Sequence, residues 1–371
     1  MSGSLQIRDI GGTVSRAALF FGGIVVLCAG FTVDAAAQAV GGPGKLAQPA
    51  DARDSAGRIL FQADRQLSYA VSTAVNRRLA PSPSSPGIAP LGYAGTTVLL
   101  ADAPALLETP AAPETQAAPL WNVWLDGQTS RTDWDDPVAG IKGPLSTVSA
   151  GADRTIADRG LIGVMVSGER SDLDTNENNG SLESRGAGAG VYAGWQISDF
   201  LVADALVLWK DLSNDVTTPI STGSYDSTRW QAAANLTGYI YRDAWRFSPT
   251  VGLSWSNEDQ DSYFDSLGFF FPEESLTAVT VTSGLQVGYG ISTTSGGTIE
   301  PWLGVGLDYE ANREDVPAGA DDPSRFDLRV NGGVNAQFSD AVSLTLTGEA
   351  GALNRGGYAT YRGAAQLSVR F

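Results

Sequence analysis

Apolar and polar residues alternate along the last two thirds of the chain. In the final segment, every second residue from Tyr361 to Phe371 is apolar or small, and the residues between them are mostly polar. The segments 342–350 and 303–309 repeat this pattern. A period of two residues is typical of a β-strand with one apolar and one polar face. The pattern therefore predicts a β-structure between residues 120 and 371.

The same alternation predicts twelve strands with unequal connections. We place the strands at residues 120–128, 145–155, 160–169, 185–197, 200–210, 228–241, 244–256, 276–292, 298–309, 326–338, 342–353 and 359–371. Short turns alternate with polar loops of about 15–19 residues, and only the last loop is short. A soluble sandwich would also alternate, but these connections, the even strand number and the strand lengths are typical of a membrane barrel. The predicted fold class is all-β, a twelve-stranded antiparallel transmembrane β-barrel, because closure removes unpaired edges.

Residues 38–118, which precede the barrel, are rich in alanine and proline. Within residues 51–79, apolar side chains recur at helical spacing, and the charged residues Asp64, Arg65, Arg77 and Arg78 lie largely on the other face. Prolines from Pro81 onward would end this helix. So few large apolar residues favour a tether with one helix, a very short passenger or plug, over a folded domain.

The first 37 residues have the three parts of a secretory signal peptide. Arg8 and Arg16 precede an apolar run at residues 17–33, and small residues follow. Ala35 and Ala37 fit a peptidase site after Ala37, and cleavage after Ala39 is also compatible. The alternative is a membrane anchor, although the run is at the lower limit for a spanning helix. We therefore expect three parts: residues 1–37, 38–118 and 119–371.

Composition excludes several classes of function. The chain has no histidine, one cysteine and a net charge of −17. Without histidine there is no Ser-His or Cys-His nucleophile pair and no His-ligated metal. Without paired cysteines there is no disulfide framework. An acidic chain is a poor candidate for nucleic-acid binding. Most of the negative charge falls in the long loops, which is typical of a barrel with a polar outer side.

Aromatic residues gather near the predicted strand ends, and each could also be simple core packing. As a set they favour girdles at the two membrane–water interfaces. Phe269, Phe270 and Phe271 stand together in a long loop beside two glutamates. They mark either a contact site or a segment that folds back over the barrel mouth, and the sequence does not choose between the two.

Several charged residues fall on the predicted inward faces of the strands. Paired carboxylates can act as general acid and base, but the lumen of a membrane barrel is ordinarily polar. We therefore predict a hydrated lumen with salt bridges and not an active site. The predicted lumen charges are Asp204, Glu300, Asp308, Asp327, Arg329, Glu349, Arg362 and Arg370.

One acidic loop resembles a calcium-binding template. Its oxygen-bearing residues occur at positions 1, 3, 5, 7 and 12 of that template. Glu177 stands where the template needs glycine, and acidic hairpin loops are also common for solubility alone. A bound calcium ion is therefore a weak candidate, and no other cofactor is predicted. The candidate ligands are Asp172, Asp174, Asn176, Asn178 and Glu183.

The secretory signal, the strand count, the C-terminal position of the barrel and the ending at Phe371 together resemble an autotransporter-type outer-membrane translocator domain over residues 119–371. The resemblance implies that the last strand carries the signal for the barrel-assembly machinery. It assigns that signal to Tyr361, Leu367, Val369 and Phe371.

The resemblance also implies a function. The barrel would sit as a monomer in the outer-membrane lipid, with its long acidic loops outside, and would anchor or translocate its own short N-terminal segment. It implies no enzyme, because barrel proteases and lipases rely on a histidine that this chain lacks. Self-cleavage at a pore asparagine is disfavoured, because none occurs between Asn76 and Asn122. Two alternatives remain: a passive pore, and an adhesin-like barrel whose loops meet surface ligands.

Overall fold

A computed structural model describes residues 54–80, 120–137, 140–157, 159–176, 179–294, 297–312 and 324–371. The predicted signal peptide, with Ala35 and Ala37, lies outside the described residues. So does most of the alanine- and proline-rich segment that follows the helix.

The described chain consists of one helix and a large set of antiparallel strands. Helix α2 spans Asp54–Leu79 and confirms the helical spacing seen in the sequence. The long strands are β1 (Trp121–Trp134), β2 (Ile141–Ile156), β3 (Gly160–Thr175), β4 (Gly180–Ser198), β5 (Leu201–Thr217), β6 (Thr222–Gly238), β8 (Trp245–Gln260), β11 (Glu274–Tyr289), β13 (Thr298–Asn312), β14 (Phe326–Gln337), β15 (Val342–Gly351) and β16 (Tyr358–Arg370). The short strands are β7 (Ile240–Arg242), β9 (Tyr263–Phe264), β10 (Phe270–Phe271) and β12 (Ile291–Ser292).

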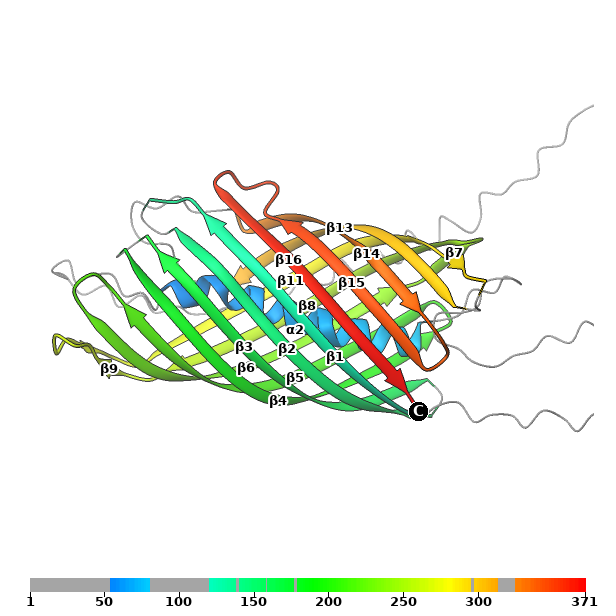
Figure 1. Cartoon of the computed structure of the whole chain (residues 1–371), viewed down its shortest axis with the longest axis horizontal. Coiled ribbons are helices and arrows are strands. Elements are labelled where there is room, and N and C mark those ends of the chain that lie inside the picture. The colour runs from blue at the N-terminus through cyan, green and yellow to red at the C-terminus, as the bar shows by residue number, and fades with distance from the viewer. Residues whose placement is uncertain are drawn as a thin grey trace, which may run out of the picture. The chain divides into compact units, whose positions relative to one another are not determined.

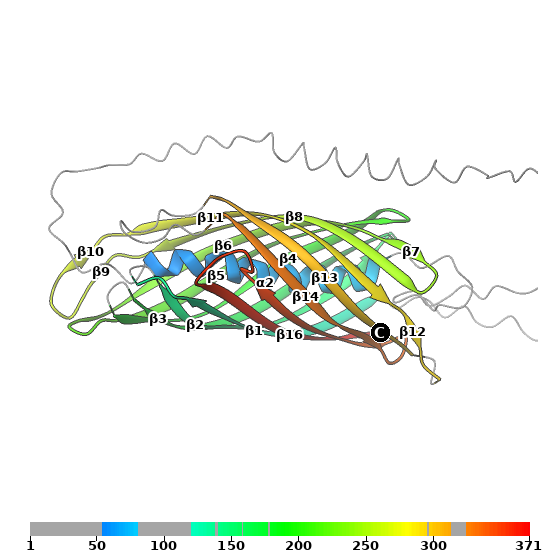
Figure 2. The same ribbon diagram turned by 90° about the horizontal axis from the view of Figure 1, so that it is seen from above.

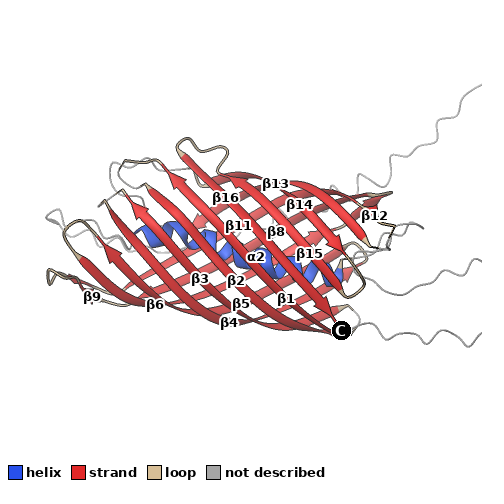
Figure 3. Cartoon of the chain, viewed as in Figure 1, coloured by secondary structure: helices blue, strands red, loops and turns tan. Residues whose placement is uncertain are grey.

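The long strands form a closed barrel, as the alternation predicted. Each pairs antiparallel with its neighbours along the chain, and β1 also pairs with β16, which closes the sheet (Figures 1 and 3). The backbone amide of Trp121 donates to the carbonyl of Phe371 at 3.1 Å, and the amide of Phe371 donates to Trp121 at 3.1 Å. The result is the predicted twelve-stranded antiparallel barrel with one N-terminal helix.

The barrel has two ends that we name by what forms them. The C-terminal mouth is the end where β1 begins and β16 ends, and short turns join the strands there. The hairpin mouth is the opposite end, where β3 ends at Thr175, β5 at Thr217 and β8 at Gln260. The β9–β10 hairpin belongs to the hairpin mouth, because it follows β8 directly.

The outer surface carries an apolar band with aromatic residues at both edges. Outward-facing residues of β3 such as Val164 and Val166 are more than half exposed, as a lipid-facing surface requires. Two exposed aromatic girdles border this band. The girdle at the C-terminal mouth contains Trp121, Trp195, Phe200, Trp245, Tyr289, Phe338 and Phe371, and the other contains Trp209, Trp230, Trp255, Tyr309, Phe326 and Tyr361.

The strands extend further toward the hairpin mouth than the sequence analysis predicted. The long loops predicted after residues 169 and 210 were wrong, because β3 stays paired with β4 up to Thr175 and Gly180, and β5 stays paired with β6 up to Thr217 and Thr222. Beyond the girdle, the strands invert their polarity: Leu212 and Val216 of β5 are buried inside, whereas Asp211 and Asp215 are exposed outside. This part of the barrel is built like a water-soluble sheet.

Helix α2 is strongly polar over much of its surface. None of the described helices is apolar enough over sufficient length to cross a bilayer. Its place in the fold therefore depends on partners that satisfy those polar groups.

Candidate functional site: a helix inside the barrel

Helix α2 lies inside the barrel along its axis, and two perpendicular views agree on this position (Figures 1 and 2). Near its N-terminal end, Leu60 packs in a cluster with Trp134, Leu173 and Tyr358 at the hairpin mouth. Near its C-terminal end, Arg78 donates to the carbonyl of Leu120 at the C-terminal mouth. The helix therefore spans the lumen with its N-terminus toward the hairpin mouth.

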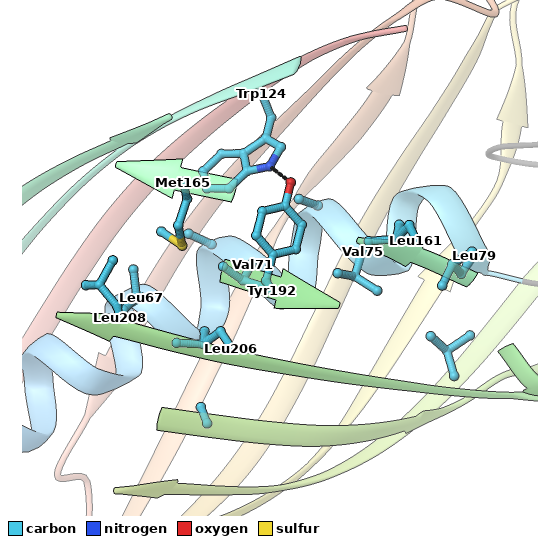
Figure 4. Close-up of a cluster of buried hydrophobic side chains, with 14 of the residues drawn as sticks. Leu67, Val71, Val75, Leu79, Trp124, Leu161, Met165, Tyr192, Leu206 and Leu208 are labelled. Carbon is cyan, nitrogen blue, oxygen red and sulfur yellow. Dashed lines mark hydrogen bonds between the residues drawn. The ribbon is translucent and has the colours of Figure 1, made fainter. Parts of the chain in front are cut away.

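One face of α2 packs against the wall formed by β1 to β5. Leu67, Val71, Val75 and Leu79 recur at helical spacing and are all buried in the second apolar cluster (Figure 4). The opposing side chains come from inward-facing positions of the strands. They include Trp124, Leu161, Met165, Tyr192, Leu206 and Leu208.

This contact is close enough to require glycine at one position of the wall. A Cβ added to Gly194 of β4 would lie 2.2 Å from Cγ1 of Val75. Next to it, the indole nitrogen of Trp124 donates to the hydroxyl of Tyr192 at 2.7 Å (Figure 4). That hydroxyl donates to Asp153 at 2.9 Å. The apolar wall is therefore fixed by a polar relay at its edge.

An ion-pair cluster joins the helix to the opposite wall. Arg65 of α2 donates from Nη1 to Oδ2 of Asp308 at 3.0 Å, and its Nη2 lies 2.8 Å from Oε1 of Glu349. Arg329 and Arg362 contact the same two carboxylates at 3.0 and 3.1 Å. Three arginines and three acids therefore balance in charge inside the lumen. We call this the Arg65 cluster: Arg65, Arg329, Arg362, Asp308, Asp327 and Glu349.

A second cluster lies against Asp64, the helix residue directly before Arg65. Arg229 contacts Glu169 at 2.6 Å and Glu258 at 2.7 Å, and Lys210 also pairs with Glu169. Asp64 of α2 interacts electrostatically with Arg229 and Lys210. All five side chains are buried. We call Glu169, Lys210, Arg229 and Glu258 the Glu169 cluster.

The backbone and polar side chains of α2 also bind the barrel directly. Gln66 donates to Ser130 at 2.7 Å and accepts from Thr147 at 2.8 Å. Gln366 donates to the carbonyl of Ala70 at 2.8 Å, and Arg370 donates to the carbonyl of Arg77 at 2.9 Å, one of the carbonyls left free at the helix C-terminus. The helix is thus a fitted part of the lumen and not a loosely threaded segment.

The helix fills the lumen unevenly. A cavity of about 210 Å³ lies between its polar face, with Ser68 and Ser72, and the walls of β8, β11, β13 and β14. The cavity reaches Arg370 and Gln337 at the C-terminal mouth. Toward the hairpin mouth, the Arg65 cluster and the apolar cluster around Leu60 occupy the cross-section. The cavity therefore extends from the C-terminal mouth to the Arg65 cluster, which contributes Arg65, Arg329 and Arg362 to its lining.

The structure places the predicted lumen charges on the inward faces of the strands. Five of them, Asp308, Asp327, Arg329, Glu349 and Arg362, meet in the Arg65 cluster. Asp204 accepts from Ser72 of the helix at 3.0 Å. Glu300 pairs with Arg246 at 2.7 Å, and Arg370 contacts the helix C-terminus.

Sequence reasoning missed two groups in this site. Glu169 is the last residue of its predicted strand and was not among the predicted lumen charges, and Glu258 fell into a predicted loop, because the apolar alternation ends there. Asp64 and Arg65 were assigned to the polar face of the helix, and nothing in the helical spacing shows that a charged wall surrounds that face. The signal that could have found them is the inward position of Lys210 and Arg229, two cations that need buried acidic partners.

The other predicted residues lie on the outer surface or at its edges. Tyr361, Leu367, Val369 and Phe371 of the proposed assembly signal are exposed on one face of the last strand and its end. Asp172 and Asp174 are exposed on β3, opposite Glu183 and Ser181 of β4. Asn176 donates to the carbonyl of Asp136 at 2.7 Å. Asn178 lies outside the described residues, and calcium binding stays a prediction.

Comparison with known proteins finds one matching family and several solved structures with a similar fold. A family model described as the autotransporter beta-domain matches residues 123–349. The translocator domain of the autotransporter NalP from Neisseria meningitidis is similar, with a TM-score of 0.63, 13% identity, and coverage of 86% of this chain and 98% of that one. The beta domain of the Bordetella autotransporter BrkA has a TM-score of 0.57 and 15% identity, covering 68% of this chain and 100% of that one.

The transport unit of the autotransporter AIDA-I from Escherichia coli has a TM-score of 0.52 and 12% identity, covering 70% of this chain and 93% of that one. At these identities the similarity establishes the fold alone. Comparison with curated proteins finds no match.

Proposed function

Because the chain belongs to the autotransporter beta-domain family, we propose that its barrel translocates its own N-terminal segment through the pore and then anchors it. The family is one of non-enzymatic transport barrels of the outer membrane, so the lipid contact and the outer-membrane location predicted from the sequence follow from membership. The passenger-carrying role of this particular chain is the part that we propose.

The direction in which α2 runs through the barrel is the observation that supports the proposal. Its C-terminus lies at the C-terminal mouth, where β1 begins, and its N-terminus points toward the hairpin mouth. A chain that enters the lumen from the side of β1 and runs toward the hairpin mouth has the path of an exported N-terminal segment. Residues 38–53 would then emerge at the hairpin mouth, and the acidic hairpins would face the outside of the cell.

The proposal also keeps the predicted division of the chain. Residues 1–37 would be removed as a signal peptide, residues 38–118 would supply the short exported segment, the plug and the linker, and residues 119–371 would form the barrel. The many contacts between helix and lumen support an end state in which α2 stays in the pore as the anchor.

Single cysteines in a Cys28→Ser background test this topology. Gln48→Cys probes the segment before the helix, Leu267→Cys probes the exposed tip of the β9–β10 hairpin, and Asp340→Cys probes a turn at the C-terminal mouth. Intact cells would be treated with a membrane-impermeant maleimide. We expect labelling of Gln48→Cys and Leu267→Cys, and labelling of Asp340→Cys only after the outer membrane is permeabilised.

The same variants separate the alternatives. Labelling of Leu267→Cys but not of Gln48→Cys in intact cells would contradict export of the segment and favour a passive pore with a periplasmic N-terminus. Labelling of Asp340→Cys but not of Leu267→Cys would contradict the orientation itself.

A further inference from the structure

The outer surface of β1 to β4 differs from the rest of the barrel where the apolar band ends toward the hairpin mouth. On β5, β6 and β8 the band ends at Trp209, Trp230 and Trp255. In register with Trp209, β4 has Ala189, and β3 has Val166. The aromatic girdle is therefore interrupted over β1 to β4.

Arginines stand beyond this gap. Arg131 of β1, Arg170 of β3 and Arg185 of β4 all face outward, and their side chains are 57%, 58% and 62% exposed. On each of these strands, the next outward residue away from the band is acidic: Asp133, Asp172 and Glu183. The order from the membrane outward is thus apolar, basic, acidic. The outward positions in register with Arg185 are neutral on β5, at Ser213, and acidic on β6, at Asp226.

The arrangement is unfavourable for the sheet on its own. Arg170 lies directly opposite Arg185 in the β3–β4 register, and Asp172 lies directly opposite Glu183. Like charges at opposed positions destabilise an antiparallel pair, whereas exchanging one arginine with one acid would pair opposite charges. Glu183 is the acid that approaches both arginines, with Oε2 at 3.3 Å from Arg185 and 3.9 Å from Arg170. Arg170 and Arg185 are therefore placed by height above the band and not by pairing across the strands, whereas Lys142 of β2 lies opposite Asp133 and Asp174.

Their height matches the headgroup layer of a bilayer. Arg185 is four residues from Ala189, about 13 Å along the strand, or roughly 10 Å above the girdle for a tilted strand. The side chain of an arginine placed just beyond the apolar band can lie along the apolar surface while its guanidinium stays among polar headgroups. Between the arginines and the apolar band lie small residues, Gly168 and Ala187 in register with each other, and on β1 an added Cβ at Gly127 would meet nothing within 4 Å.

We propose that Arg170 and Arg185, together with Arg131 two strands away on β1, bind the phosphate groups of a phosphorylated lipid in the leaflet at the hairpin mouth. Guanidinium groups bind phosphate oxygens in bidentate fashion, so two adjacent arginines suit a headgroup that carries more than one phosphate. The acyl chains would lie on the shallow strip of small residues below. The anionic phosphates would also relieve the repulsion between Arg170 and Arg185.

Lipid retention by the purified full chain tests this site. The barrel would be folded in detergent, mixed with bis-phosphorylated lipid A, and analysed by native mass spectrometry. The variant Arg170→Gln/Arg185→Gln is compared with Arg242→Gln/Arg325→Gln, which removes the same charge at exposed positions outside the patch. We expect the first pair to weaken lipid binding roughly 25-fold, about fivefold per basic residue at an anionic interface, and the second pair to change it little. Glu183→Gln should strengthen binding, because it frees both arginines.

Equal lipid binding by wild type and the Arg170→Gln/Arg185→Gln variant would overturn the proposal. Displacement of the lipid by millimolar inorganic phosphate would also overturn it, because the site would then bind free anions. Heat-modifiable migration shows that each variant is folded, and Arg185→Gln alone, expected to lose about fivefold, replaces the pair if the double variant does not fold.

Discussion

Arg65 joins helix α2 to the charged wall of the barrel. Its guanidinium reaches Asp308 and Glu349, which lie on two different strands, and both carboxylates are also held by arginines of the barrel. A buried charge network of this kind is costly to break from one side, because the remaining partners lose their compensation. Arg65 therefore joins the helix to carboxylates that already pair with Arg329 and Arg362 of the barrel.

Arg65→Ala should loosen the plug without preventing barrel assembly. Two arginines and three acids would remain in the cluster, so the helix would lose an anchor worth about 3 kcal/mol while the strands keep their ladders. We expect the fraction of time that the pore conducts in planar bilayers to rise roughly tenfold or more. Arg242→Ala, which removes a cation from an exposed position outside both the lumen and the lipid site, is the control. An unchanged conducting fraction in Arg65→Ala would show that the Arg65 cluster does not hold the plug.

The lumen charges show what period-two alternation can and cannot predict. Asp308, Asp327, Arg329, Glu349 and Arg362 were placed inside because each alternates with outward apolar residues on a strand crossing the membrane. Arg65 and Asp64 carry no comparable signal, since a polar helix face is equally compatible with water. Their role depends on side chains more than a hundred residues away, and no local pattern encodes that distance.

At the level of elements, the strands crossing the membrane were predictable and their outer ends were not. The alternation predicts that the strand beginning at residue 200 ends at residue 210, whereas β5 continues to Thr217. Within the membrane, lipid forces apolar residues outward. Beyond it, water forces Asp211 and Asp215 outward and allows Leu212 and Val216 inside. The outward face therefore changes from apolar to polar where the strand leaves the lipid, although the backbone pairing of β5 with β6 continues to Thr217.

At the level of elements, the last strand is also predicted from the family resemblance to carry the assembly signal. Phe371 is 68% exposed at the C-terminal mouth, and its backbone pairs with Trp121 at the seam that closes the barrel. Because its side chain makes no large contribution to the core, Phe371→Ala should leave a folded barrel stable once formed.

We nevertheless expect Phe371→Ala to reduce the amount of heat-modifiable barrel in the outer membrane severalfold, while the chain still reaches the periplasm. Phe338→Ala is the matched control, because Phe338 is a similarly exposed aromatic of the same girdle, 60% exposed, directly after the end of β14. An equal yield of both variants would refute a special role for the terminal aromatic.

At the scale of the whole molecule, the barrel and the helix together make a closed pore. The apolar cluster around Leu60, the Arg65 cluster and the Glu169 cluster fill the half nearer the hairpin mouth. The half nearer the C-terminal mouth keeps a polar cavity beside the helix. Without α2, the charged and polar side chains that now bind it would line an open, hydrated channel.

The most direct test of this account is the single-channel conductance of the refolded full chain against a variant that lacks residues 38–118. The account predicts low conductance for the full chain and a severalfold larger, stable conductance for the truncated barrel, because the helix occupies the lumen. Equal conductance of the two proteins would place the helix outside the pore, and the translocation account would give way to that of a passive pore.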